Sequence, residues 1–211
     1  MKKNSFFAGL AVVLLVCAGV FTSCVSSSID WFKMEIKSNS NTRSQLPNLR
    51  NATADTELYQ QAETLMSGFL DTRGEAYGYY SIDLRYSSSA PASFLAWTLL
   101  HSFTLYLPAL LGVPTDSTKF TITAYLNIFD SAGNLVQSLN RTGSFVQTGG
   151  IYYGHNPTPK AGKEYSKLFN ELLEIANMRS REITDELMAA GPITQENTAA
   201  ARTRISQFKI Q

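Results

Sequence analysis

The stretch KFTITAYLNIFD, residues 119–130, has the most regular alternation of apolar and polar side chains in this chain. A period of two predicts a β-strand with one buried face. The turn-forming residues DSAGN at 130–134 follow it, and residues 135–146 predict the returning strand of a hairpin. Asp130 and Asn134 also carry oxygens that suit calcium, but the ligand spacing of an EF-hand is absent. We therefore interpret this loop as a turn.

Two further stretches alternate in the same way. Residues 29–37 (IDWFKMEIK) predict a first strand, with Phe32, Met34 and Ile36 on one face. Residues 77–86 (YGYYSIDLRY) predict another strand, whose inward face is formed by Tyr80, Ile82, Leu84 and Tyr86. Between them, residues 38–53 are rich in Ser, Asn and Arg and predict a loop or linker.

Helical spacing appears in two places. Residues 55–70 repeat apolar side chains every three or four positions, with Thr53 as the expected N-cap. Residues 161–190 predict a long helix that ends at Gly191. The tail predicts a short helix and then a strand at residues 204–210. This order of elements predicts an α+β fold, in which helices pack on one face of a mixed, largely antiparallel sheet.

The N-terminus has the pattern of a secretory signal peptide. Lys2 and Lys3 precede an apolar run at residues 6–20, and the small residues Thr22 and Ser23 follow it. The apolar run is shorter than the roughly 20 residues that a membrane span needs. We therefore expect residues 1–23 to be removed.

The residues around the cleavage position, Phe21-Thr22-Ser23-Cys24, resemble the lipobox of bacterial lipoproteins. This resemblance implies that Cys24 becomes the first residue and carries the lipid. In enterobacterial lipoproteins an acidic residue after the cysteine favours the inner membrane. Val25 is not acidic, so the resemblance implies a lipid anchor in the outer membrane, facing the periplasm. An ordinary secreted protein with an incidental cysteine is the alternative.

Cysteine chemistry is excluded by the same interpretation. The chain has two cysteines, of which Cys17 lies in the removed segment and Cys24 is blocked by lipid. Residues 24–53 then comprise the lipidated cysteine, a tether and the first strand, and residues 54–211 a single α/β domain. Lys and Arg number 18 against 17 Asp and Glu, so no basic surface for nucleic acid is indicated.

Taken together, the anchor, the strand–helix–strand opening and the hairpin before a helix resemble a group of small envelope lipoproteins. That group has a TolB-amino-terminal-like fold and includes penicillin-binding-protein activators and the curli-secretion lipoprotein. The resemblance rests on the order of elements and on the lipobox. It implies a non-catalytic role in the cell envelope.

Candidate catalytic residues are few. His101 lies within an apolar stretch and His155 in a glycine-rich loop, and no serine-hydrolase or zinc-protease motif contains either of them. Lys163 follows Gly162, but the other residues of a phosphate-binding loop are missing. We therefore expect no enzyme activity, no cofactor and no metal site.

Residues 94–113 (FLAWTLLHSFTLYLPALLGV) form an apolar stretch without a charged side chain. Pro108 would interrupt a membrane-spanning helix, and polar residues dilute the run. Burial in the core, contact with the membrane, a true span and docking to a partner all remain open. We expect partial packing against the sheet, with apolar surface left for membrane or partner through Trp97, Leu99, Phe103 and Tyr106.

Two functions from different classes follow. The first is an interaction or assembly factor of the envelope, which contacts a protein partner through a sheet edge or through exposed aromatic residues such as Tyr152 and Tyr153. The alternative is a carrier or auxiliary subunit for an apolar ligand such as lipid. A carrier should contain a closed apolar cavity, whereas a docking protein should show a filled core and an exposed patch.

Overall fold

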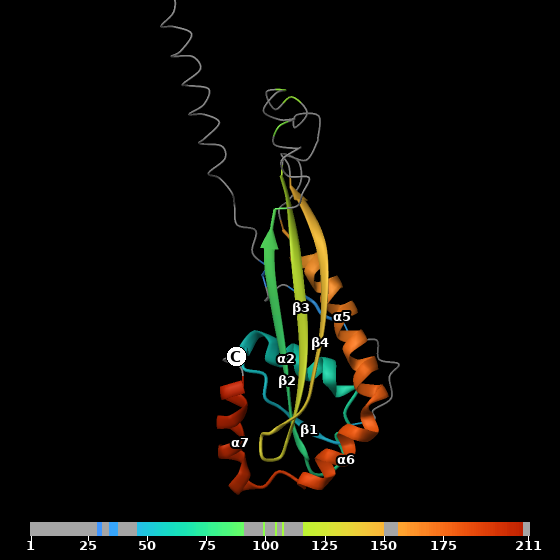
Figure 1. The fold of residues 1–211 in the computed structure, drawn as a ribbon, viewed down its shortest axis with the longest axis vertical. Helices are drawn as coiled ribbons and strands as arrows, with labels where there is room; N and C mark the ends of the chain where they lie inside the picture. The colour runs from blue at the N-terminus through green and yellow to red at the C-terminus, as the bar shows by residue number, and fades with distance from the viewer. Residues whose placement is uncertain are drawn as a thin grey trace, which may run out of the picture.

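The predicted hairpin lies at the centre of the structure. This structure is a computed structural model, and it describes residues 29–30, 34–37, 46–90, 99, 104, 107, 116–149 and 156–208. Strand β3 (Asp116–Asp130) pairs antiparallel with β4 (Leu135–Gly149) along their whole length. Strand β2 (Gly78–Ser89) pairs antiparallel with the other side of β3. Strand β1 (Leu49–Asn51) is parallel to β2, so the sheet is mixed, with the order β1-β2-β3-β4 (Figure 1).

The loop between β3 and β4 is a turn held by Asp130. One oxygen of its carboxylate accepts hydrogen bonds from the backbone N–H groups of Ala132 (2.9 Å) and Asn134 (2.8 Å). The other oxygen accepts one from the side-chain amide of Asn134 (2.8 Å). Gly133 has a φ of +83°, which favours glycine. The prediction of a turn is confirmed.

One face of the sheet forms the main core. The alternating side chains of β3 that the sequence placed inward are all fully buried: Phe120, Ile122, Ala124, Leu126 and Ile128. Three helices cover this face, namely α2 (Thr56–Ser67), α5 (Thr158–Met178) and α6 (Ser180–Ala190). The predicted α+β class, with a mixed, largely antiparallel sheet, is therefore confirmed, and these three helices pack on one face as expected.

The predicted helix bounds need two corrections. Asp55, and not Thr53, caps α2, because its carboxylate accepts the backbone N–H of Leu58 (3.3 Å). Thr53 instead accepts the N–H of Ile82 through its hydroxyl (3.2 Å). The long helix predicted at residues 161–190 is two helices, α5 and α6, which meet at Arg179. Its predicted end at Gly191 is correct.

The prediction of a first strand at residues 29–37 is wrong for the residues that the structure describes there. Met34 is buried, as its alternation suggested, but residues 34–37 lie against helices instead of a strand. Gln61 of α2 donates to the carbonyl of Met34 (2.9 Å), and the N–H of Lys37 donates to the hydroxyl of Ser166 on α5 (2.9 Å). The first strand, β1, lies within the stretch predicted as loop.

The strand predicted at residues 204–210 is also wrong for its described part. Helix α7 (Gln195–Phe208) lies there, on the opposite face of the sheet from the other helices. Ala201 and Ile205 pack against Tyr79 and Phe129 in a small second core. These two apolar residues are four positions apart, which is the spacing of one helix face. The alternation of apolar and polar residues at the end of the chain predicted a strand incorrectly.

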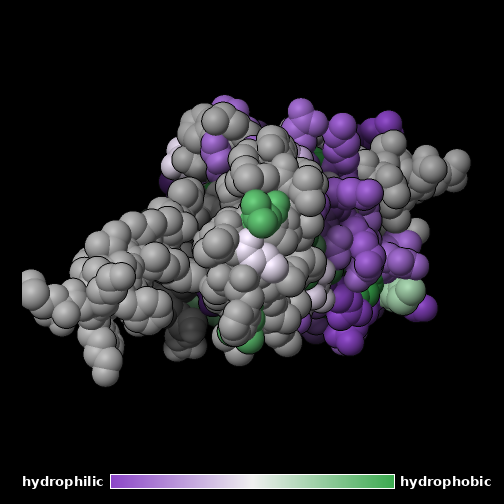
Figure 2. Space-filling view, turned by 90° about the horizontal axis from the view of Figure 1, so that it is seen from above, coloured by the Kyte–Doolittle hydropathy of each residue, from purple (hydrophilic) through white to green (hydrophobic). Residues whose placement is uncertain are grey.

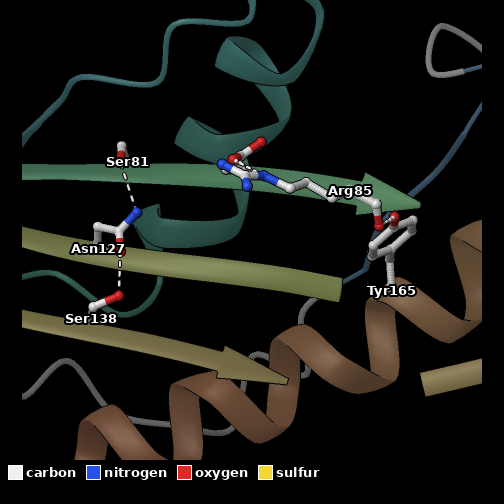
Figure 3. Close-up of polar contacts among 6 residues, drawn as sticks. Ser81, Arg85, Asn127, Ser138 and Tyr165 are labelled. Carbon is white, nitrogen blue, oxygen red and sulfur yellow. Dashed lines mark hydrogen bonds and ion pairs between the residues drawn. The ribbon is translucent and has the colours of Figure 1, made fainter. Parts of the chain in front are cut away.

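Polar residues occupy the middle of that opposite face. Asn127 of β3 is only 6% exposed and bonds across both neighbouring strands (Figure 3). It donates to the hydroxyl of Ser81 on β2 (3.5 Å) and accepts from that of Ser138 on β4 (2.7 Å). Beside it, the guanidinium of Arg85 lies 5.1 Å from the ring centre of Tyr125.

Candidate functional site

Different connecting segments are attached at the two ends of the sheet. At one end, which we call the loop end, β2 finishes at Ser89, β3 begins at Asp116 and β4 finishes at Gly149 (Figure 1). Asp116 pairs with Gly149, and Ser89 pairs with Lys119 close by. Residues 90–115 and residues 150–155 therefore leave the sheet at the same end. The other end, formed by the turn at Asp130, we call the hairpin end.

The start of the described chain also lies near the loop end. The N–H of Asp30 donates to the hydroxyl of Thr158, the first residue of α5 (3.0 Å). Two residues further on, the ammonium of Lys160 donates to the carbonyl of Val146 (3.1 Å), near the end of β4. Ile29 is only 4% exposed, so the described chain is packed into the domain at this residue.

Most of the site residues predicted from sequence fall in stretches of which the structure gives no description. These are Cys24, Trp97, Phe103, Tyr106, Tyr152 and Tyr153, and both histidines fall there too. Leu99 is described and is 55% exposed, and Leu107 is 61% exposed. The N–H of Leu107 donates to the carbonyl of Thr104 (3.0 Å). The apolar stretch thus presents leucine side chains to its surroundings at two points.

Three exposed lysines lie on α5 near the loop end. Lys160, Lys163 and Lys167 are exposed in the first three turns of α5, at spacings that place them on neighbouring parts of one helix face. The first turn of α5 has no acidic residue, although a helix N-terminus favours negative charge. Figure 2, which looks down on the loop end, shows a hydrophilic surface on the side of α5. The spacing of these lysines is visible in the sequence, but their place at this end is not.

The hairpin end of the sheet bears a groove that the sequence analysis did not predict. We call it the β1 groove, and its volume is about 850 Å³. Strand β1 forms part of it, together with Tyr79 and Tyr80 of β2, which pair with Phe129 and Ile128 near the turn. Helix α2 contributes Tyr59, Glu63 and Ser67, and α7 contributes Arg202, Ile205 and Ser206. Each set follows the i, i+3 or i, i+4 spacing of one helix face.

Charged and hydroxyl groups meet in this groove. Glu63 lies beside Tyr59, one turn further along the same face of α2. Burial raises the pKa of Tyr59, and Glu63 raises it further, whereas Arg202 lowers it. Burial also raises the pKa of Tyr80 strongly, with smaller contributions from Glu63 and Tyr59. Both phenols therefore keep their protons at neutral pH and serve as hydrogen-bond donors.

One buried polar atom in the groove has no partner. Tyr79 lines the groove and is almost fully buried, and its hydroxyl makes no hydrogen bond with any described residue. An unsatisfied buried hydroxyl is costly, so it is a candidate for contact with a ligand. Because the groove joins β1, α2 and α7, sequence patterns within any one element could not reveal it.

The described helices include none that combines the length and the apolar character needed to cross a bilayer. Within the same residues, no three His, Cys, Asp or Glu side chains are grouped so as to hold a metal ion.

Comparison with known proteins gives little. No family model matches the chain, and no curated protein matches it. Among solved structures, the crystal structure of a minor lipoprotein from Acinetobacter baumannii matches with a TM-score of 0.29 and 13% identity. The match covers 69% of this chain and 94% of that chain. Likeness at this level establishes neither a shared fold nor a shared function.

Proposed function

We propose that this protein is a lipid-anchored protein of the bacterial envelope that acts as a non-catalytic interaction or assembly factor. The lipobox-like residues that end at Cys24 support the anchor, and Val25 supports the outer membrane, facing the periplasm. The observation that carries the proposal is the contact of Asp30 with Thr158. It joins the N-terminal segment to the domain at the loop end of the sheet.

The length of the tether then orients the molecule. The buried Ile29 is five positions after Cys24, and five residues span at most about 18 Å. A lipid on Cys24 would therefore hold the loop end close to the membrane. The apolar stretch at residues 94–113 leaves the sheet at this same end, and Lys160, Lys163 and Lys167 would face anionic headgroups.

The described core favours an interaction factor over a carrier of apolar ligands. The side chains between the sheet and α2, α5 and α6 are almost completely buried and fill the interior. The β1 groove is lined by charged residues at its rim, unlike the closed apolar cavity that a lipid carrier needs. Partner contact through the aromatic loop that contains Tyr152 and Tyr153 remains part of this proposal.

The anchor is tested by Cys24→Ala in the full chain, expressed in bacteria with a labelled fatty acid. The variant should lose all lipid label and should no longer partition into detergent with the membrane fraction. Cys17→Ala is the matched control and should be labelled like the parent, because Cys17 lies in the removed segment. Detergent partitioning of Cys24→Ala equal to that of the parent would refute the anchor.

The interaction role is tested by capture from solubilised membranes with the anchor intact. A double variant, Tyr152→Ser with Tyr153→Ser, should recover less of a captured partner while its thermal unfolding stays unchanged. Loss of thermal stability with unchanged capture would instead show that these tyrosines pack inside the domain. If the protein instead co-purifies with a stoichiometric lipid in addition to the one attached to Cys24, the carrier function would be favoured.

A further inference from the structure

The β1 groove runs along the free edge of the sheet. Strand β1 is the end strand, and no other described strand pairs with its far side. The residues that flank β1 direct main-chain groups toward β2. The carbonyl of Asn48 accepts the N–H of Tyr77 (2.9 Å), and the N–H of Ala52 donates to the carbonyl of Tyr80 (2.7 Å). Alternation then directs the main-chain groups of Leu49 and Asn51 away from the sheet.

These outward groups are a template for one more strand. Neither the N–H nor the carbonyl of Leu49 or Asn51 bonds another described residue outside the sheet ladder. Native proteins usually shorten, charge or cover such an edge. Here the edge is short, but α2 and α7 stand on its two faces and leave the groove between them. This is the shape that an extended peptide fills when it adds to a sheet.

The two walls of the groove differ in charge. Arg50 is in register with Tyr79, so its side chain lies on the same face of the sheet as α7, which contributes Arg202. Within the described part of the chain, neither guanidinium forms an ion pair. On the opposite wall, α2 contributes the carboxylate of Glu63 beside Tyr59. One wall therefore attracts carboxylates and the other repels them.

We propose that the β1 groove binds an extended segment of a partner protein, which adds a strand to β1 and carries acidic side chains at alternate positions. Because successive side chains of a strand point to opposite faces, every second residue would face Arg50 and Arg202. The residues between would face Tyr59 and Glu63 and should be neutral.

This proposal rests on the proposed interaction function and names the chemistry of the partner. Its test is independent of the anchor, because it uses the full chain in detergent, with or without lipid on Cys24, and measures peptide binding only. The probe is a short fluorescent peptide in which Glu alternates with Thr, followed by fluorescence anisotropy. A peptide with Lys in place of Glu is the charge control and should not bind.

Two protein variants and one matched control decide the charge contacts. Arg50→Glu and Arg202→Glu should each weaken binding of the Glu–Thr peptide at least tenfold. Arg181→Glu makes the same change of net charge on the exposed surface of α6 and should weaken it less than twofold. Thermal unfolding of all three variants should match the parent, since these arginines are exposed.

Backbone methylation decides whether the peptide adds as a strand. Methyl groups on the amides of one alternate set remove the donors that face β1, and should abolish binding in one of the two sets only. Equal binding of both methylated peptides, no binding of the Glu–Thr peptide, or equal losses in all three arginine variants would overturn the proposal. So would a concentration-dependent dimer that Arg50→Glu dissociates, because a second copy would then occupy the groove.

Discussion

Tyr165 joins the loop end of α5 to the sheet through one fully buried side chain. Its ring is 0% exposed, and its hydroxyl donates to the carbonyl of Arg85 on β2 (2.6 Å; Figure 3). Tyr165→Phe keeps the ring and removes the donor, so the free energy of unfolding should fall by about 1 kcal/mol at pH 7. Urea denaturation measures this change.

The same residue should make stability depend on alkaline pH. Burial raises the pKa of Tyr165, and Asp83 and Tyr86 raise it further. Below about pH 10 the folded and unfolded states both keep the proton, so the contribution is complete there. Above pH 10 the unfolded state loses its proton first, and stability falls as pH rises toward the raised pKa of the folded state.

Tyr165→Phe should therefore lose less stability than the parent between pH 10 and pH 11. Phe169→Leu is the control, because it weakens the same buried face of α5 without removing a titratable group. Its dependence on pH should equal that of the parent. An unchanged slope in Tyr165→Phe would contradict the argument.

At the scale of elements, a single glycine sets how closely residues 34–37 approach α5. A Cβ on Gly162 would lie 2.8 Å from the carbonyl oxygen of Glu35 and 3.1 Å from Cγ of Met34. Alanine favours a helix by about 1 kcal/mol over glycine, but a clash with backbone costs about 1–3 kcal/mol. The steric effect should prevail.

Gly162→Ala should therefore lower the free energy of unfolding and speed hydrogen exchange at the amide of Lys37, which bonds Ser166. Gly68→Ala is the matched control, because its Cβ would meet nothing within 4 Å. It should be neutral or slightly stabilising. If Gly162→Ala is as stable as Gly68→Ala, residues 34–37 do not pack against α5 in this way.

Helix α7 should detach before the rest of the domain. It contacts the sheet through Ala201, Ile205 and the ring of Phe208, and the second core around Tyr79 and Phe129 is small. Ile205→Ala should cost about 2 kcal/mol, the lower end of the range for a buried isoleucine. Fast hydrogen exchange confined to α7 would show the detachment, whereas the exposed Gln207→Ala should leave exchange unchanged.

The elements that could be predicted are those defined by the residue pattern of their own segment and by contacts with segments close in sequence. The hairpin of β3 and β4 follows from its own alternation and from the turn at Asp130, and α2 and α5 follow from their apolar stripes. Strand β1 has only three residues and is defined by its pairing with β2. Residues 29–37 alternate like a strand but pack on helices, which no local pattern distinguishes.

At the scale of the whole molecule, the β1 groove escaped prediction for the same reason. Tyr59 and Glu63 are four residues apart and could be placed on one face of α2, but Arg202 and Arg50 join them only through the fold. The loop end and the groove lie at opposite ends of the sheet. Ser89 and Tyr80 are nine positions apart on β2, or about 30 Å. An anchor at the loop end would therefore present the groove to the periplasm.

This orientation can be tested with two positions on one strand. Val146 near the loop end and Leu135 at the hairpin end are both exposed on β4. They are eleven positions apart along the strand, which is about 36 Å. The mature chain would have no other free thiol, so Val146→Cys and Leu135→Cys can each carry one fluorophore.

In vesicles with spin-labelled headgroups, the probe at position 146 should be quenched more strongly than the probe at position 135. Adding Cys24→Ala should remove the quenching at both positions. Stronger quenching at position 135 would show that the hairpin end faces the membrane. Equal quenching with the anchor present would show that the tether does not orient the molecule.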